Sequence, residues 1–295
     1  MRAGFVNIVG MPNAGKSSFL NAIMGTKYAI VSHKPQTTRQ RMLCILNKEN
    51  IQLVFSDSPG FVDRALYKLH HAMNKEIYSA IEDADLLLFV LDGLSKIEQQ
   101  VELLKKVLDS KIKTAIVINK MDEIKSSQLS AIYDELKIIA ENIPVFEVSS
   151  KTNAGLDAVI QWAENNVPEH EAYFPADDVS EKPIRYFLSE MIREQIYLNY
   201  SDEIPYSTIV VINSCKGVDE QAELVKIDAT IMVNKSSQLA IIVGKNGSAI
   251  KNLGIKSREA IEQFLGQRVF LGLTAKLKEN WREDENFLKK TGINL

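Results

Sequence analysis

The chain has 295 residues, of which 45% are hydrophobic and 25% are charged. These values are ordinary for a globular protein and, at roughly 150 residues per domain, leave room for two domains. The net charge of −3 excludes a protein that binds nucleic acid through its whole surface. The two cysteines, Cys44 and Cys215, lie too far apart in the sequence to form a metal-ligand motif.

The distribution of charge and apolar residues restricts partners and location. Residues 1–179 carry 19 Lys and Arg against 23 Asp and Glu, a net charge of −4, whereas residues 180–295 carry 16 against 15, a net charge of +1. Any nucleic-acid contact must therefore come from a local basic patch. No apolar run approaches the ~20 residues that span a bilayer, and the first predicted strand leaves no room for a signal peptide. Together with the small number of cysteines, this predicts a cytoplasmic protein.

The first elements form a strand, a turn, a helix and a long loop. Residues 3–9 read as a strand, and residues 16–25 as a helix that ends at a glycine. Residues 28–41 are polar and read as an exposed loop, long enough to have a function of its own. Residues 42–46 and 51–57 then read as a pair of hairpin strands.

Strands and helices alternate in the chain that follows. The apolar spacing predicts helices over 65–82, 97–109, 127–141 and 156–167, and strands over 84–93, 114–119 and 144–150. This alternation predicts an α/β fold with a doubly wound, mostly parallel sheet. Ligands of such folds bind at the carboxyl edge of the strands.

The last third of the chain predicts a second, α+β domain. Residues 169–183 are polar, acidic and contain proline, which is typical of a linker. After it we expect, in order, a helix over 184–200, strands over 206–214, 223–233 and 237–243, helices over 248–254 and 257–265, and a strand over 268–278. The predicted domains are therefore 1–168 and 184–295.

The sequence GMPNAGKS, residues 10–17, matches the phosphate-binding pattern G-x-x-x-x-G-K-[ST] between a strand and a helix. Backbone N–H groups of the turn and the positive end of the helix favour a polyphosphate. In such loops the lysine reaches the β- and γ-phosphates and the serine hydroxyl binds Mg²⁺. The residues expected at the phosphates are Gly10, Asn13, Ala14, Gly15, Lys16, Ser17 and Ser18.

Two further stretches predict contacts to Mg²⁺ and the γ-phosphate. In DSPG, Asp57 can hold Mg²⁺ through water and the amide of Gly60 can meet the γ-phosphate. In the exposed loop, a threonine of the TTR stretch can bind Mg²⁺ only when a γ-phosphate is present, which makes the loop a switch. Thr37 and Thr38 are both candidates, and we favour Thr38.

The stretch NKMD predicts recognition of guanine. The carboxylate of Asp122 can accept hydrogen bonds from N1–H and the 2-amino group of guanine, two donors that adenine lacks. Lys120 would lie along the base and Asn119 would tie neighbouring loops together. After the next strand, backbone amides of the SSK stretch are expected near the guanine 6-oxo group; its residues are Ser149, Ser150 and Lys151.

The stretch GKNG, residues 244–247, predicts a second binding element. It follows a predicted strand and opens a predicted helix, and a G-x-x-G turn between a strand and a helix is typical of the backbone clamp of a KH domain, which holds about four nucleotides of single strand. The chain from residue 229 to residue 258 contains five basic residues and no acidic one, which favours RNA. The expected RNA contacts are Ile241, Gly244, Lys245, Asn246, Gly247, Ile250, Lys251, Lys256 and Arg258, with Leu253 as a further candidate beneath the bases. Trp281 could stack a base or dock the last strand.

The combination of GMPNAGKS, PQTTR, DSPG, NKMD and SSK with a C-terminal GKNG module resembles the Era family of ribosome-assembly GTPases over nearly the whole chain. The resemblance implies a P-loop GTPase domain followed by a type II KH domain. It implies GTP or GDP and Mg²⁺ as ligands, and 16S ribosomal RNA near its 3′ end and the 30S subunit as partners. It also implies a monomer, with peripheral association at the inner face of the cell membrane.

One position sharpens the expected mechanism. Many small GTPases have a glutamine after Asp-x-x-Gly that orients the attacking water, but this chain has Phe61. Relatives with this substitution use the phosphate-loop asparagine to help bind K⁺, and Asn13 matches that position; the alternative is that Asn13 only stabilises the loop. The residues expected to act in hydrolysis are Lys16, Thr38, Gly60 and Asn13, with low intrinsic turnover.

Two other functions remain open from the sequence. The first is an RNA-binding scaffold whose nucleotide is structural and not turned over, which the absence of a glutamine at residue 61 allows. The second is a membrane-associated signalling GTPase, which the lack of a basic amphipathic anchor disfavours.

Overall fold

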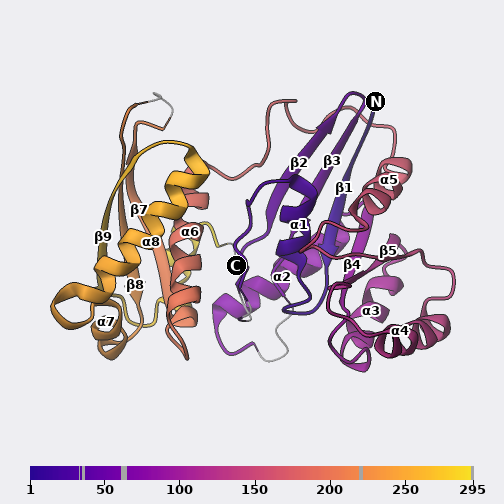
Figure 1. Ribbon diagram of the computed structural model, residues 1–295, viewed down its shortest axis with the longest axis horizontal. Helices are drawn as coiled ribbons and strands as arrows, with labels where there is room; N and C mark the ends of the chain where they lie inside the picture. The colour runs from indigo at the N-terminus through magenta and orange to yellow at the C-terminus, as the bar shows by residue number, and fades with distance from the viewer. Residues whose placement is uncertain (33, 35–36, 61–64, 219–221, 294–295) are drawn as a thin grey trace. The chain divides into compact units, whose positions relative to one another are not determined.

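The structure is a computed structural model that describes residues 1–32, 34, 37–60, 65–218 and 222–293. The chain forms two compact units (Figure 1). The first unit comprises Met1–Ala29, Thr38–Leu66 and His70–Glu181, and the second comprises Ile30–Thr37, Tyr67–Leu69 and Lys182–Leu295. Part of the long polar loop therefore packs with the C-terminal part of the chain.

The first unit contains a six-stranded sheet in the order β2-β3-β1-β4-β5-β6. Its strands are β1 (Arg2–Val9), β2 (Met42–Lys48), β3 (Ile51–Asp57), β4 (Leu86–Asp92), β5 (Lys113–Asn119) and β6 (Val145–Glu147). Only the β2–β3 pair is antiparallel; the other pairs are parallel. The predicted hairpin and the predicted mostly parallel sheet are both confirmed.

Helices cover both faces of this sheet, as the uninterrupted apolar strands require. They are α1 (Lys16–Met24), α2 (Lys68–Glu82), α3 (Glu98–Asp109), α4 (Ser126–Ile139) and α5 (Leu156–Asn166). Side chains of α2, α3 and α4 share one apolar core with β4 and β5, while α1 and α5 contact β3 and each other. Every residue of β4 is buried. Because both faces are covered, a ligand can reach the sheet only at the ends of its strands.

The carboxyl ends of the central strands lie at one edge of the sheet. Gly10 follows β1, and Asp57, Asp92 and Asn119 are the last residues of β3, β4 and β5. Across the strand pairs, Ile8 is in register with Asp57, and Asp92 is in register with Asn119. The polar stretches that the sequence singles out therefore meet at this edge.

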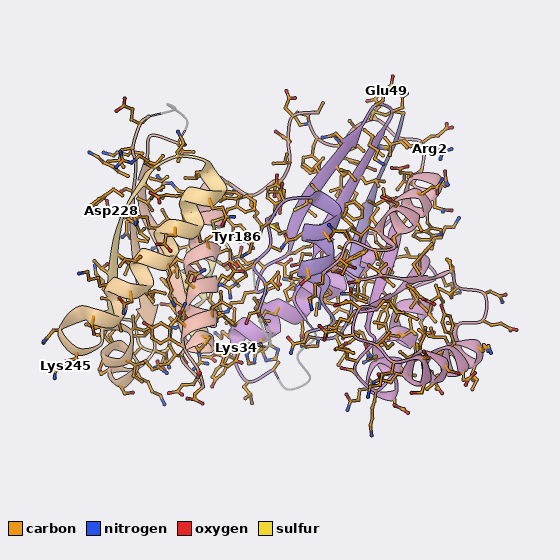
Figure 2. All side chains as sticks on the ribbon, in the orientation of Figure 1. Arg2, Lys34, Glu49, Tyr186, Asp228 and Lys245 are labelled. Carbon is orange, nitrogen blue, oxygen red and sulfur yellow. The ribbon has the colours of Figure 1, made fainter. Side chains whose placement is uncertain are left out.

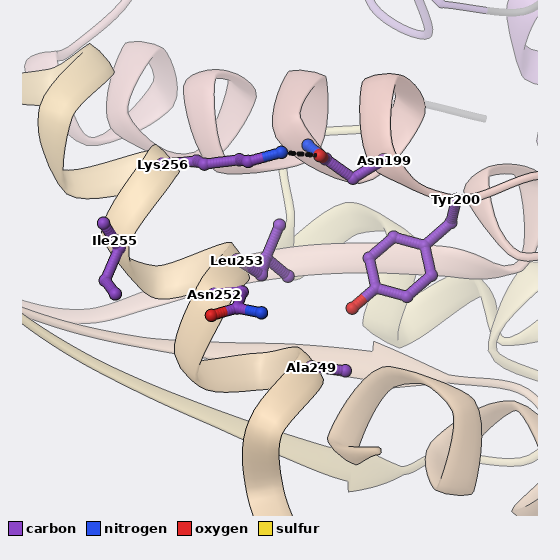
Figure 3. A pocket seen from close by; sticks show the side chains of 7 residues that line it. All are labelled: Asn199, Tyr200, Ala249, Asn252, Leu253, Ile255 and Lys256. Carbon is purple, nitrogen blue, oxygen red and sulfur yellow. Dashed lines mark hydrogen bonds between the residues drawn. The ribbon is translucent and has the colours of Figure 1, made fainter. Parts of the chain in front are cut away.

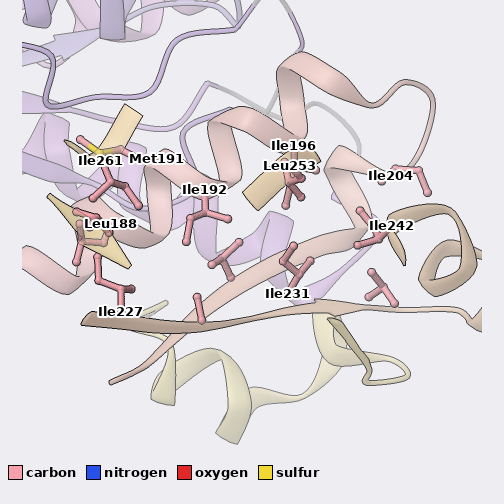
Figure 4. Close-up of a cluster of buried hydrophobic side chains, with 14 of the residues drawn as sticks. Leu188, Met191, Ile192, Ile196, Ile204, Ile227, Ile231, Ile242, Leu253 and Ile261 are labelled. Carbon is pink, nitrogen blue, oxygen red and sulfur yellow. The ribbon is translucent and has the colours of Figure 1, made fainter. Parts of the chain in front are cut away.

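The second unit is a three-stranded sheet covered by helices. Its elements are α6 (Ile184–Asn199), β7 (Thr208–Lys216), β8 (Val225–Val233), α7 (Ser236–Val243), α8 (Ser248–Leu265), β9 (Val269–Leu277) and α9 (Glu285–Lys290). Strand β8 pairs antiparallel with β7 and parallel with β9. Figure 4 shows how apolar side chains of α6, β8 and α8, among them Ile192, Ile231 and Ile261, fill the space between helices and sheet.

The structure differs from the prediction at two places in this unit. Residues 237–243 form helix α7 and not a strand, because a short run of branched apolar residues does not distinguish the two. The side chain of Gln238 accepts hydrogen bonds from the backbone N–H groups of Asn234 (3.1 Å) and Lys235 (3.0 Å), which caps the helix. The two helices predicted over 248–254 and 257–265 are one continuous helix, α8.

Candidate functional site

The loop between β1 and α1 has a backbone conformation and close contacts that only glycine allows at two positions. Gly15 has a φ of +90°, and a Cβ there would lie 2.3 Å from Nδ2 of Asn119. A Cβ on Gly10 would lie 2.3 Å from the carbonyl oxygen of Val90. Asn13 is exposed and also has a positive φ, of 63°. The loop therefore needs glycine at its two pattern positions, and Asn13 occupies its open side.

Lys16 begins helix α1 and is buried. Its Nζ donates hydrogen bonds of 3.0 Å to the carbonyl oxygens of Gly10 and Met11, so the side chain folds back across the loop. Burial lowers the pKa of Lys16 to about 8, although the nearby charge of Asp57 raises it. A cation held with so little solvation favours an anionic ligand in the loop.

Three oxygen atoms meet beside the loop. The hydroxyl of Ser17 donates to Oδ2 of Asp57 at 2.7 Å. The hydroxyl of Thr38 lies 3.0 Å from the hydroxyl of Ser17 and 3.2 Å from Oδ2 of Asp57. Thr37 differs, because its hydroxyl donates to the carbonyl oxygen of Lys34 at 2.6 Å. Thr38 is therefore the threonine that joins this oxygen cluster, and two hydroxyls with one carboxylate suit a hard cation such as Mg²⁺.

The DSPG turn approaches the same loop. A Cβ on Gly60 would lie 2.9 Å from a side-chain atom of Pro12 and 3.0 Å from its Cα, so the turn and the loop touch. Ser18 lies in the first turn of α1, and Ala14 is buried. Phe61, which stands in the sequence where many small GTPases have glutamine, lies outside the described residues.

Asn119 connects three loops at the edge of the sheet. Its Nδ2 donates to the carbonyl oxygen of Ala14 at 3.1 Å. Its Oδ1 accepts hydrogen bonds from the backbone N–H (3.1 Å) and the hydroxyl (2.9 Å) of Ser150. The NKMD stretch is thereby held against both the phosphate loop and the SSK stretch.

Asp122 is held as a carboxylate. The hydroxyl of Ser149 donates to its Oδ1 at 2.6 Å, and Nζ of Lys151 lies 3.6 Å from its Oδ2. The hydrogen bond from Ser149 is the main cause that lowers the pKa of Asp122, and the charge of Lys151 adds to it. The side chain is therefore an acceptor at neutral pH, as recognition of guanine requires.

Two further residues of this site, Asp92 and Gln100, were not expected from the sequence. Nζ of Lys120 lies 2.9 Å from Oδ2 of Asp92, whose oxygens also accept from the N–H of Leu94 (3.0 Å) and the hydroxyl of Ser95 (2.8 Å). The buried amide of Gln100 accepts from the N–H of Asp92 at 2.8 Å and donates to its carbonyl oxygen at 3.1 Å. Gln100 thus holds the backbone of Asp92 in place, and the carboxylate of Asp92 holds the side chain of Lys120 in place.

One signal in the sequence could have revealed Asp92. It is the polar residue that ends the apolar run of β4, as Asn119 ends that of β5, and parallel neighbours bring such residues to the same edge.

The GKNG stretch forms a tight turn directly before α8. Gly244, Asn246 and Gly247 have φ values of 71°, 51° and 76°. A Cβ on Gly244 would lie 2.6 Å from Cβ of Ala249, whereas one on Gly247 would meet nothing within 4 Å. Lys245 is exposed at the tip of the turn (Figure 2). The backbone of this turn is accessible to a ligand, and α8 presents its N-terminal N–H groups there.

The other predicted RNA-binding residues lie on several sides of α8 and α7. At 100° per residue, Lys251 and Arg258 share one side of α8, while Lys256 lies about 140° away from Lys251. Ile241 is 49% exposed, whereas Leu253 is 2% exposed and belongs to the core. Ile250 is half-buried on α8.

Trp281 is fully buried, and its Nε1 donates to the carbonyl oxygen of Ser207 at 3.0 Å. It therefore docks the chain after β9 and is not placed to stack a base. Among the residues that the structure describes, no helix is long and apolar enough to span a membrane.

Comparison with known families gives two matches. Residues 5–120 match the family described as 50S ribosome-binding GTPase, and residues 203–282 match the KH domain. The first match covers the phosphate loop and ends within the NKMD stretch, and the second contains the GKNG turn.

Relatives match the chain over its whole length. GTPase Era of Thermotoga maritima is 39% identical over 298 residues, which cover 99% of this chain and 98% of the relative. A GTPase ERA-like chloroplastic protein of Oryza sativa is 38% identical over 294 residues, which cover 99% of this chain and 69% of the relative.

Solved structures agree with these relatives. A crystal structure of Era with MgGDPNP and nucleotides 1506–1542 of 16S ribosomal RNA has a TM-score of 0.93 and 31% identity, with each chain fully covered. A structure of an Aquifex aeolicus Era variant bound to GDP·AlF4⁻ has the same TM-score, identity and coverage.

Proposed function

Because the chain belongs to the Era family of GTPases, we propose that it is a GTP-hydrolysing switch that binds 16S ribosomal RNA near its 3′ end and assists assembly of the 30S subunit. The observation that carries the proposal is the match over the full length to Era in complex with MgGDPNP and 16S ribosomal RNA. It is supported by the presence of the oxygen cluster and the GKNG turn in one chain.

GTP would lie along the carboxyl edge of the six-stranded sheet. Lys16 neutralises the β- and γ-phosphates once they replace the carbonyl oxygens that its Nζ now contacts. Asp122 accepts from N1–H and the 2-amino group of guanine, and Lys120 lies along the base. ATP does not supply the two donors of guanine to this carboxylate, and a hydrogen bond lost in this way costs roughly 1–3 kcal/mol or more.

The oxygen cluster fits Mg²⁺. Ser17 and Thr38 would bind the ion directly and Asp57 would bind it through water, since all three oxygens already lie within 3.2 Å of a neighbour in the cluster. When bound, the ion supplies positive charge between the β- and γ-phosphate oxygens. Because Thr38 belongs to the long polar loop, its contact with the ion would link that loop to the γ-phosphate.

Hydrolysis requires that water attack the γ-phosphorus, that the bond to the β–γ bridging oxygen break, and that GDP and phosphate form. We assign Lys16, Thr38 and the amide of Gly60 to stabilising the γ-phosphate as charge develops on it. Asn13, on the open side of the loop, would help bind K⁺ beside the phosphates. Equal turnover in K⁺ and Na⁺ would contradict the role of Asn13.

The GKNG turn would clamp the backbone of single-stranded RNA. Lys245 contacts a phosphate and the glycines allow close approach of the sugar-phosphate chain. Ile241 and Ile250 provide apolar contact to bases, and Asn246, Lys251, Lys256 and Arg258 extend the surface.

The proposal divides the chain into a GTPase domain (1–168), a linker (169–183) and an RNA-binding domain (184–295). We also propose that the protein is a monomer and that it lies in the cytoplasm, with peripheral contact to the inner face of the cell membrane. These proposals rest on the family resemblance alone. Sedimentation equilibrium and flotation with vesicles test these two properties.

Crosslinking in cells tests the RNA partner. Ultraviolet crosslinking followed by sequencing of the bound RNA should recover the 3′ end of 16S ribosomal RNA from the natural chain and much less of it from Gly247→Asp. Recovery of unrelated RNAs at the same level from both proteins would overturn the assignment.

A further inference from the structure

A pocket of about 370 Å³ lies between the C-terminal end of α6 and the first turns of α8 (Figure 3). Its volume is at the small end of the range for ligand pockets, roughly 300–1,000 Å³. The residues that line it include Asn199, Tyr200, Ala249, Asn252, Leu253 and Lys256. All of them belong to the second unit.

The pocket is close to the GKNG turn but lies on a different side of α8. Ala249, Asn252 and Lys256 are spaced three and four residues apart, so they share one side of the helix. Ile250 and Lys251, which we assign to the RNA clamp, lie about 100° and 160° around the helix from Ala249. Since Ala249 is only two residues after the turn, the same strand of RNA can reach both places.

The lining combines an aromatic ring, an apolar floor and polar groups. Figure 3 shows the ring of Tyr200 extending towards Leu253 and Asn252 on α8. The hydroxyl of Tyr200 donates to the carbonyl oxygen of Ile242 at 3.4 Å, which orients the ring. Burial raises the pKa of Tyr200, so the phenol is neutral.

Two side chains at the pocket offer polar contacts. In the described part of the chain, the exposed amide of Asn252 makes no hydrogen bond, so both its donor and its acceptor are open to a ligand. Nζ of Lys256 is held at the pocket by Oδ1 of Asn199. Among the residues that the structure describes, no carboxylate lines the pocket, and the sequence from residue 229 to residue 258 contains no acidic residue.

We propose that this pocket binds one base of single-stranded RNA, next to the nucleotides clamped at the GKNG turn. An aromatic face with an apolar floor suits a base, the amide of Asn252 suits its hydrogen-bonding edge, and Lys256 suits the adjoining phosphate. The inference rests on the proposed RNA-binding function, and it extends the RNA contact beyond the clamp to a second side of α8.

Binding of a fluorescent RNA with the sequence of the 16S 3′ end, measured by anisotropy, tests the pocket. Asn252→Ala should weaken binding about five- to tenfold and leave GTP hydrolysis unchanged. Gln263→Ala removes another exposed amide from the same helix, outside the pocket, and should change the affinity less than about twofold. Equal affinity of Asn252→Ala and the natural chain would overturn the inference.

A scan with abasic nucleotides identifies what occupies the pocket. Each position of the RNA in turn loses its base, and each RNA is bound to the natural chain and to Asn252→Ala. One position should be found at which the penalty of Asn252→Ala disappears, because its base is already missing. An identical penalty with every abasic RNA would overturn the inference.

The same assay separates this inference from the function on which it rests. If the natural chain does not bind the RNA, the proposed function and the pocket both fail. If the natural chain binds and Gly247→Asp weakens binding whereas Asn252→Ala does not, only the pocket inference fails.

Discussion

The nucleotide site and the GKNG turn differ in how strongly their side chains hold one another. At the nucleotide site, Asn119, Asp122 and Lys120 each have a partner from another loop within 3.1 Å. At the turn, Lys245 and Asn246 are exposed, and the shape comes from backbone angles. A preorganised site fixes which ligand fits, whereas an open turn fixes only where a backbone can pass. Substitutions should therefore change selectivity at the first and overall affinity at the second.

The largest effect is expected for Lys16→Ala, which removes the one buried cation of the phosphate loop. The kcat/KM for GTP should fall by roughly 10²–10³, the usual cost of losing a group that stabilises developing charge. Phosphate release under steady-state conditions measures it. Lys105→Ala removes an exposed lysine of α3 and should have no effect; equal activity of the two variants would contradict the role of Lys16.

Asp122→Asn tests whether the base loops set selectivity. The amide presents a donor where guanine needs an acceptor, so affinity for GDP should fall about 100-fold and affinity for xanthosine diphosphate should rise. Competition with a fluorescent nucleotide measures both. The control is Glu123→Gln, a substitution at the neighbouring residue. It leaves the carboxylate of Asp122 in place as the acceptor for guanine and should leave guanine selectivity intact. Unchanged selectivity in Asp122→Asn would show that another group reads the base.

Gly247→Asp tests whether the turn acts through its backbone and charge. A negative side chain in the clamp should weaken RNA binding at least tenfold while GTP hydrolysis is spared. Gly266→Asp is a matched control, because Gly266 has a similar φ, 66°, at the other end of α8, and a Cβ there also meets nothing within 4 Å. Equal loss of RNA affinity in both variants would mean that helix strain, and not the clamp, is responsible.

Asp92→Asn sharpens the account of the guanine loops. Loss of the ion pair frees Lys120 from its fixed position, so KM for GTP should rise about tenfold while kcat is unchanged, as expected for a charged hydrogen bond of roughly 1.5–3 kcal/mol. Glu98→Gln, an exposed acid nearby in sequence, is the control. A fall in kcat at constant KM would contradict a role in base binding.

The smallest effect concerns the proton on Lys16. Because burial lowers the pKa of this lysine to about 8, the free loop loses the ammonium proton as the pH rises through that value. Phosphates favour the charged form, so binding of GDP above pH 8 must take up a proton. Calorimetry in buffers of different ionisation enthalpy should find little uptake at pH 7.0 and more than half a proton at pH 8.5. Equal uptake at the two pH values would contradict a neutral lysine in the free loop.

The nucleotide site and the second unit also differ in how well the sequence predicts them. The phosphate loop follows a strand with an unambiguous apolar run, and Asp57 and Asn119 are the last residues of two other such strands; parallel strands bring their ends together. Asp92 also ends such a run, but its role depends on a contact with Lys120 directly after the next strand. The role of Gln100 depends on hydrogen bonds from α3 to the backbone of Asp92, which no short pattern contains.

The second unit was harder to predict. Residues 237–243 are apolar enough for a strand, and only the cap from Gln238 and the tertiary packing make them helix α7. Lys256 was grouped with Lys251 by charge, but a helix separates residues five apart onto different sides. Trp281 could not be assigned until its partner Ser207, far away in the sequence, was located.

A GTP-hydrolysing switch that binds RNA requires that the nucleotide at the first site change the RNA affinity of the second unit. The most direct test is the affinity for the 3′-end RNA of 16S ribosomal RNA, measured with GDP and with a non-hydrolysable GTP analogue. We expect tighter binding with the analogue, because the γ-phosphate would hold Thr38, and the residues directly before it, Ile30–Thr37, belong to the C-terminal unit. Identical affinity in the two nucleotide states would contradict the account.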